Sequence, residues 1–280
     1  MEERAMPEAA RLLITGGAGR VATLIRPHLR TAGMRLRLLD RQPVEDLEAD
    51  EEAVSADLSD PEALRAAMAG CGAVLHLAGC TTDAPWPEQI ADSVAGCANL
   101  FEAARAAGVE RVVYASSNHA VGFYPRDRRV GSDVTLRPDS RYGVGKAFGE
   151  LLGAFFADKY GMRVLAIRIG SAEPAPLDRR RLSIWISPRD LAQLVRIGVT
   201  HPGLRFAAVY GVSDNARSFY DNGVAEALGY RPLDRAEDHA AAILARDPPP
   251  AVPLPAGEVA QGGTFAEAGF VGDPARLREW

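Results

Sequence analysis

The chain has 280 residues, a formal net charge of −5, 47% hydrophobic residues and three cysteines. This length and composition predict a globular chain with one large domain or two closely joined domains. The acidic balance without a basic run argues against nucleic acid as a partner. No signal peptide or bilayer-length apolar stretch is apparent, and the cysteines lack metal-ligand spacing. We therefore expect a cytoplasmic protein without a membrane contact, a disulfide framework or a bound metal.

The first elements along the chain have the pattern of a dinucleotide-binding unit. After a polar stub at residues 1–10, residues 11–15 are predicted as a buried strand and residues 16–19 as a glycine-rich turn, followed by a helix to about Leu29. This order places a pyrophosphate on backbone amides at the helix N-terminus. A second strand at residues 36–39 ends in Asp40, where the motif needs a carboxylate for the adenosine ribose. The pattern therefore favours a dinucleotide site over a plain tight turn.

Asp40 also bears on the choice between the two nicotinamide cofactors. Its carboxylate would repel a 2′-phosphate, which favours NAD as the cofactor. The neighbouring Arg41 would tolerate that phosphate, so the sequence alone leaves NADP open.

Strands and helices keep alternating through the middle of the chain. We expect a helix that begins with Ser59 as its N-cap and runs to about residue 69, and another over residues 98–107. Apolar strands are expected at residues 73–77, 111–115 and 163–169. His76, inside the first of these strands, is interpreted as a core histidine. The alternation predicts an α/β fold, a Rossmann-type doubly wound parallel sheet with ligands at the carboxyl ends of its strands.

The most informative polar groups follow one of these strands. Residues 116–119, with the sequence Ser-Ser-Asn-His, come at a strand end, and Tyr142 and Lys146 lie four residues apart on one helix face. We expect the Lys146 ammonium to lower the pKa of the Tyr142 phenol from about 10, so that the phenolate acts as a general base toward an alcohol. Taken singly, these residues have plainer uses, because serines cap strand ends and asparagine and histidine form turns.

The last third of the chain is less regular. A loop-rich segment at residues 174–188 is followed by an expected helix at 188–199, a strand at 205–210, a short helix at 222–228 and a stiff proline-rich linker at 247–255. We divide the chain into an N-terminal stub (1–10), an NAD-binding Rossmann core (11–170) and a small C-terminal substrate-binding region (171–280) interleaved with the core.

Several of these stretches resemble a known family when taken together. Residues 15–19, Asp57 with Leu58, residues 116–119 and the Tyr142/Lys146 pair resemble the extended short-chain dehydrogenase/reductase superfamily. Residues 116–125, 141–146, 168–171, 180–185 and 261–265 are similar to the bacterial uronate dehydrogenases. The similarity extends over nearly the whole chain, from residue 11 to about residue 265.

The resemblance implies NAD-dependent oxidation of a hexuronic acid, glucuronate or galacturonate, at C1 to the aldaric acid lactone. It makes Tyr142 the base, places Lys146 on the nicotinamide ribose, and puts Ser117 or alternatively Ser116 on the C1 oxygen. The sugar acid would be bound by Thr81, Ser117, Asn118, His119, Ser171 and Arg180. The cofactor would be bound by Gly16, Gly19, Arg20, Val21, Asp40, Arg41, Asp57, Leu58, Leu77, Ala78, Gly79, Tyr142, Lys146 and Ile169.

Arg180 carries the expected selection for an acid sugar. A guanidinium pairs with a carboxylate through two parallel hydrogen bonds, which suits a uronate. From residue pattern alone, Arg180 belongs to a basic run at residues 179–181 that would be solvated. Trp185, farther along the same stretch, is interpreted as a packing residue.

The chain departs from the family at several positions. Arg20 stands where the family usually has Gln, and would add a second cation for a uronate or block part of the pocket. Gly145 replaces Ser beside Lys146 and is expected to loosen that helix slightly. A nucleotide-sugar epimerase or dehydratase, or another sugar dehydrogenase of the superfamily, is the alternative function, and a non-catalytic dinucleotide sensor is a third. Association into a homo-oligomer is left open.

Overall fold

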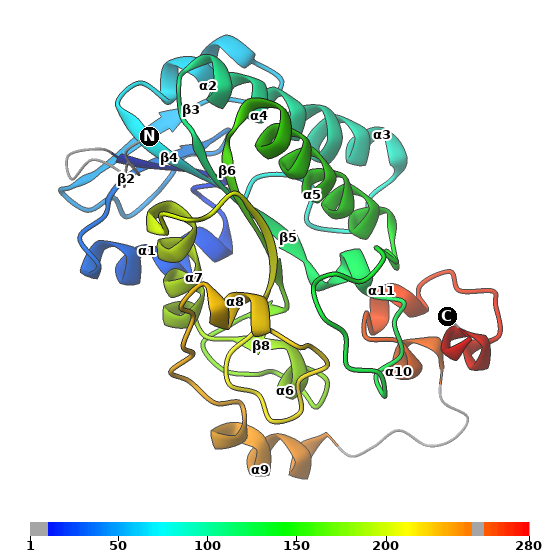
Figure 1. Cartoon of the computed structure of the whole chain (residues 1–280). Coiled ribbons are helices and arrows are strands. Elements are labelled where there is room, and N and C mark those ends of the chain that lie inside the picture. The colour runs from blue at the N-terminus through cyan, green and yellow to red at the C-terminus, as the bar shows by residue number, and fades with distance from the viewer. Residues whose placement is uncertain (1–10, 248–254, 280) are drawn as a thin grey trace.

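The computed structural model describes residues 11–247 and 255–279 of the chain. Its centre is a seven-stranded sheet in which neighbouring strands are parallel (Figure 1). From edge to edge the strands are β3 (Glu51–Ser55), β2 (Arg35–Asp40), β1 (Arg11–Thr15), β4 (Cys71–His76), β5 (Arg111–Ser117), β6 (Arg163–Ile169) and β9 (Phe206–Gly211). The strand order reverses between β1 and β4, where a doubly wound sheet binds its ligands. The predicted Rossmann-type α/β fold is confirmed.

Helices cover both faces of the sheet because alternate side chains of a strand point to opposite faces. In β1, Leu12 and Ile14 pack into one core cluster and Leu13 into the other, and all three are fully buried. The first cluster includes side chains of α1 (Arg20–Thr31) and α7 (Pro188–Thr200). The second includes side chains of α2 (Pro61–Ala67), α4 (Gly96–Ala106) and α5 (Arg141–Tyr160).

Apart from α7 and β9, the residues after β6 form short elements beside this sheet (Figure 1). They are β7 (Ser171–Ala172), α6 (Arg181–Ile184), β8 (Trp185–Ile186), α8 (Gly223–Ala227), α9 (Glu237–Arg246), α10 (Ala256–Val259), α11 (Thr264–Glu267) and η3 (Pro274–Arg278). Because β9 joins the main sheet, the carboxyl-terminal region shares the core of the molecule. Most of the predicted proline-rich linker, residues 248–254, and the stub at residues 1–10 lie outside the described residues.

Some local features differ from the sequence-based expectations. The N-cap of α2 is Asp60 and not Ser59, because the Asp60 carboxylate accepts a hydrogen bond from the Ala63 amide at 3.0 Å. Strand β3 was not predicted, since its sequence Glu-Glu-Ala-Val-Ser has no apolar run. A short helix, α3 (Trp86–Glu88), and a π-helix, η1 (Gln89–Ala95), precede α4 and were not predicted. No helix in the described ranges is long and apolar enough to cross a membrane.

Two interpretations of buried residues are confirmed. His76 is buried and its Nδ1 lies 2.7 Å from the Thr15 hydroxyl oxygen, so it is a satisfied core histidine. Desolvation by burial lowers the pKa of His76 to about 3, which keeps the ring neutral. Trp185 is buried and its indole N–H donates to the Glu173 carbonyl at 2.8 Å, as expected of a packing residue.

Candidate active site

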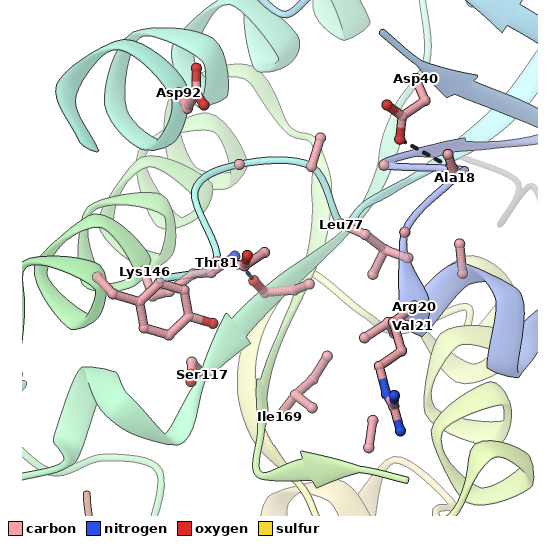
Figure 2. Close-up of a pocket in the computed structure, with 18 of the residues that line it drawn as sticks. Ala18, Arg20, Val21, Asp40, Leu77, Thr81, Asp92, Ser117, Lys146 and Ile169 are labelled. Atoms are coloured by element: carbon pink, nitrogen blue, oxygen red, sulfur yellow. Dashed lines mark hydrogen bonds between the residues drawn. The ribbon is translucent and has the colours of Figure 1, made fainter. Parts of the chain in front are cut away.

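A pocket of about 840 Å³ opens at the carboxyl ends of the strands around β1 and β4. Every residue predicted to bind the cofactor lines it, from Gly16 in the glycine turn to Ile169 at the end of β6. Of the predicted sugar-binding residues, Thr81, Ser117, His119 and Ser171 also line it. The structure therefore brings together residues that are far apart in the sequence, as Figure 2 illustrates. Asn118 and Arg180 lie outside the lining and are described below.

The glycine turn is shaped for close approach of a ligand to the backbone. Gly16 has a φ of 73°, and a Cβ at this position would lie 2.9 Å from the Ala78 backbone nitrogen. The Asp40 carboxylate accepts hydrogen bonds from the amides of Ala18 at 3.1 Å and Gln42 at 3.0 Å, and so holds the turn against the end of β2 (Figure 2). A pyrophosphate on the turn and a ribose beside Asp40 fit these residues.

The surroundings of Arg41 favour NAD over NADP. Its guanidinium lies 3.8 Å from a carboxylate oxygen of Asp57 and 3.8 Å from one of Asp92. Asp40, the preceding residue in the chain, adds a third carboxylate to the pocket lining. A 2′-phosphate would meet carboxylates at this end of the pocket, which is the arrangement expected for NAD.

Tyr142 and Lys146 lie in the first turns of α5, whose N-terminus is held by two side chains. The Ser140 hydroxyl accepts from the Gly143 amide at 3.0 Å, and the Asp83 carboxylate accepts from the Arg141 amide at 2.7 Å. The Lys146 ammonium donates to the Ala115 carbonyl at 2.8 Å and lies 5.6 Å from the centre of the Tyr142 ring. The helix therefore presents both side chains to the end of β5.

The electrostatics of this pair differ from the expectation. Burial raises the pKa of the Tyr142 phenol, and a hydrogen bond with Ser117 only partly opposes that effect. Burial also lowers the pKa of Lys146 to about 8. The lowering of the Tyr142 pKa that we expected from the Lys146 ammonium is therefore not found for the protein alone, because burial of the phenol is the largest effect on that pKa.

The two serines at the end of β5 have different partners. The Ser116 hydroxyl donates to the buried Glu150 carboxylate at 2.5 Å. Ser117 instead lies beside Tyr142, where it opposes the rise of the phenol pKa, and its oxygen accepts from the His119 amide at 3.2 Å at the start of η2 (Asn118–Val121). This pairing makes Ser117, rather than Ser116, the hydroxyl that faces the phenol.

Behind Ser116, a buried ion pair ties α5 to β6. Arg168 and Glu150 are 3% and 4% exposed, and the guanidinium donates three hydrogen bonds to the carboxylate, from Nε at 3.0 and 3.2 Å and from Nη2 at 2.9 Å. Arg168 also donates to the Tyr210 hydroxyl at 3.1 Å. Because these side chains satisfy one another, the strand end that carries the serines is fixed relative to the helix that carries Tyr142.

Removal of Glu150 tests this support. Glu150→Ala leaves the Arg168 charge buried without its carboxylate, so we expect a loss of about 3–5 kcal/mol of stability, measured by urea unfolding of the purified protein. Glu62→Ala is the matched control, because Glu62 forms an exposed pair with Arg65 at 2.8 Å and should cost well under about 1 kcal/mol. Equal stabilities for the two variants would contradict a supporting role for the buried pair.

The π-helix η1 holds the loop that carries Thr81. The Ser93 hydroxyl accepts from the Cys80 amide at 3.3 Å and donates to the Gln89 side chain at 3.1 Å. A Cβ on Gly145 would lie only 2.8 Å from the Ser93 Cβ. Gly145 therefore allows α5 to approach η1 closely, which is a more specific role than the expected loosening of the helix. π-helical turns of this kind are frequent beside functional sites.

Arg180 lies next to the pocket, where it contacts Gln261 and Asn118. Its Nε donates to the Gln261 carbonyl at 2.8 Å, and a Cβ on Gly263 would come within 2.6 Å of that nitrogen. With its amide oriented to satisfy both neighbours, Asn118 accepts from Arg180 at 3.2 Å and donates to the Ile169 carbonyl at 3.2 Å. Burial lowers the pKa of Arg180 to about 10, so the guanidinium stays charged at neutral pH. Within residues 11–247 and 255–279, no carboxylate forms an ion pair with it.

Arg20 has a partner of its own. Its guanidinium forms an ion pair with Glu173, which follows β7, and both side chains line the pocket. The Arg20 charge is therefore matched within the protein, whereas the sequence suggested an additional cation for the substrate.

Several lining residues were not anticipated, among them Asp92, Glu173 and Phe265. The centre of the Phe265 ring lies 4.3 Å from the centre of the His119 ring and 5.7 Å from the centre of the Tyr142 ring, so Phe265 forms one wall of the site. Phe265 belongs to the family-like stretch at residues 261–265, which was the available signal for it. No sequence pattern pointed to Asp92, because the π-helix that carries it into the pocket lining was not predicted.

Comparisons with known proteins place the chain in a family. Residues 12–188 match the NAD dependent epimerase/dehydratase family. The chain is 40% identical over 260 residues to the uronate dehydrogenase of Pseudomonas putida, covering 92% of this chain and 96% of that protein. A mutant uronate dehydrogenase from Agrobacterium tumefaciens, solved in complex with NAD, is 40% identical with a TM-score of 0.87 and coverage of 92% and 97%. A glucuronic acid dehydrogenase from Chromohalobacter salexigens is 39% identical with a TM-score of 0.88 and coverage of 95% and 98%. The chain therefore belongs to the uronate dehydrogenases, NAD-dependent oxidoreductases within the NAD dependent epimerase/dehydratase family.

Proposed function

We propose that this protein oxidises a hexuronic acid, glucuronate or galacturonate, at C1 to the aldaric acid lactone. The observation that carries the proposal is Arg180, a cation beside the pocket without a carboxylate partner among the described residues. A desolvated charge of this kind is stabilised by a counter-ion, and a guanidinium prefers a carboxylate. A uronate brings that carboxylate and a neutral aldose does not.

The groups around Tyr142 fit the removal of a proton from a sugar hydroxyl. NAD, when bound, supplies the hydride acceptor, and the glycine turn and Asp40 would hold it. Tyr142 takes the C1 hydroxyl proton, and Ser117 holds the C1 oxygen beside the phenol. Lys146, which lies against the Tyr142 ring, holds the nicotinamide ribose and stabilises the phenolate that forms.

The remaining polar residues of the wall suit a polyhydroxylated ring. Thr81 and Ser171 offer hydroxyl groups, and His119 offers a ring nitrogen. Asn118 and Arg180 contact each other on the same side as His119, so we infer that the carboxylate end of the sugar binds there. In this arrangement the uronate lies with C1 at Tyr142 and its acid group toward Arg180.

A panel of substrates tests the proposal. We expect NADH formation, followed by absorbance at 340 nm, with glucuronate or galacturonate, and little or none with neutral aldoses or UDP-sugars. Each substrate is assayed with NAD and with NADP. Turnover of a UDP-sugar or a neutral aldose with neither uronate active would overturn the assignment and favour another sugar enzyme of the same superfamily.

Asp40 is expected to control the preference for NAD. In Asp40→Ser the ribose loses a charged hydrogen-bond partner, so kcat/KM with NAD should fall about 10- to 150-fold while kcat/KM with NADP changes little or rises. The measurement is the ratio of the two kcat/KM values. Asp50→Ser is the control, since Asp50 pairs with Arg30 at 3.0 Å away from the pocket lining. An unchanged ratio in Asp40→Ser would remove this residue from the cofactor site.

A further inference from the structure

A buried carboxylate contacts His119 on the side away from the pocket. Asp139 Oδ2 lies 2.7 Å from His119 Nδ1, and the Asp139 side chain is 0% exposed. The His119 ring lines the pocket and lies edge-on to Tyr142 at 5.7 Å between ring centres. Asp139 was not anticipated from the sequence, because its partner is 20 residues away and faces it only in the folded chain.

Two glycines make room for this carboxylate. A Cβ on Gly122 would lie 1.9 Å from Asp139 Oδ2, and a Cβ on Gly262 would lie 1.7 Å from the same atom. The two glycines are joined by a backbone hydrogen bond of 2.8 Å, from the Gly262 amide to the Gly122 carbonyl. Asp139 Oδ1 accepts from the Ser140 hydroxyl at 2.8 Å. The carboxylate therefore occupies a fitted space with one orientation toward His119.

The ring is also held from its other sides. Phe265 packs against it at 4.3 Å between ring centres. The backbone that carries the ring is held by the His119 amide, which donates to the Ser117 hydroxyl at 3.2 Å. The second ring nitrogen, Nε2, has no hydrogen-bond partner in the part of the chain that the structure describes. It is the polar atom of His119 that remains for a ligand in the pocket.

We propose that Asp139 is a positioning residue that holds the proton of the His119 ring on Nδ1, with the Nε2 lone pair directed to a substrate hydroxyl. An ionised carboxylate only accepts hydrogen bonds, so the nitrogen that faces it must carry the proton. In a neutral imidazole the other nitrogen is then an acceptor. The inference deepens the proposed function and rests on it, because the hydroxyl belongs to the uronate ring.

Asp139→Asn is the test, because the change keeps the shape but allows the amide to donate to Nδ1. The ring then favours the opposite tautomer, with the proton on Nε2 and no acceptor for the substrate. Nitrogen-15 NMR of the histidine side chains, assigned with His119→Gln, should show Nδ1–H in the wild type and Nε2–H in Asp139→Asn. We expect kcat/KM for the uronate to fall about 5- to 150-fold, chiefly through KM, with NAD affinity unchanged.

Ser140→Ala separates this role from support of the helix. It removes the hydroxyl that caps α5 and contacts Asp139 but leaves the His119–Asp139 contact, so loss of the cap should lower the thermal midpoint while the tautomer stays as in the wild type. In a double-mutant cycle, Asp139→Asn should add little to the loss caused by His119→Gln, because Asp139 acts through His119. Additive losses in that cycle would instead mean a general structural role and overturn the proposal.

The NMR measurement needs no substrate, so the two proposals fail separately. A wild-type ring with its proton on Nε2 overturns the role of Asp139, even when uronates are oxidised and even when Asp139→Asn does not fold. Nδ1–H in the wild type with no uronate turnover overturns the proposed function while the tautomer assignment holds.

Discussion

Tyr142→Phe is expected to lower kcat for the uronate about 100- to 10,000-fold, the usual contribution of a positioned general base. The variant keeps the ring that packs against His119 and Phe265 and loses the hydroxyl that takes the proton. NADH formation at 340 nm measures the loss. Binding of NAD, measured by calorimetry, should remain close to that of the wild type, because Asp40 and the glycine turn are unchanged.

Tyr160→Phe is the matched control for this result. Tyr160 ends the same helix, and its side chain is 41% exposed and distant from the pocket lining. The control should retain full kcat. If Tyr142→Phe also kept most of its turnover, the base would have to be another group of the site, and the assigned direction of proton transfer would be wrong.

Arg180→Ala is expected to lower kcat/KM for a uronate about 30- to 5,000-fold, with most of the change in KM. The loss corresponds to removing one partner of a buried charge pair, about 2–5 kcal/mol. Arg180→Lys should recover only part of the loss, because an ammonium does not reproduce the two parallel bonds of a guanidinium. Initial rates over a range of uronate concentrations give both constants.

Arg181→Ala is the control for the charge itself. Arg181 is the next residue in the chain, but its guanidinium pairs with Asp178 and it is not part of the pocket lining. We expect little change in the KM of the control. A KM that is unchanged in Arg180→Ala, with the thermal midpoint also unchanged, would show that the substrate carboxylate binds elsewhere and would remove the main support for an acid sugar.

The fold was predictable because its signals are local. A fully buried parallel strand needs a short apolar run, and the runs in β1, β4, β5 and β6 stand out from the polar segments between them. β3 escaped prediction because it is an edge strand with alternating exposure, which needs few apolar residues. The π-helix escaped because its hydrogen-bond pattern depends on packing against α5 and not on composition.

The candidate site was predictable as a set of residues but not as a set of contacts. The sequence by itself determined the alternation of strands and helices, the glycine turn with Asp40, and the Tyr142/Lys146 spacing, because each is a pattern within one or two neighbouring elements. Only the tertiary structure decided that Ser116 faces Glu150, that Arg20 pairs with Glu173, and that Asp139 backs His119. These three contacts join residues that are far apart in the sequence and meet only in the folded chain. Burial at the site then shifts the pKa values of its side chains, and no local sequence pattern encodes that shift.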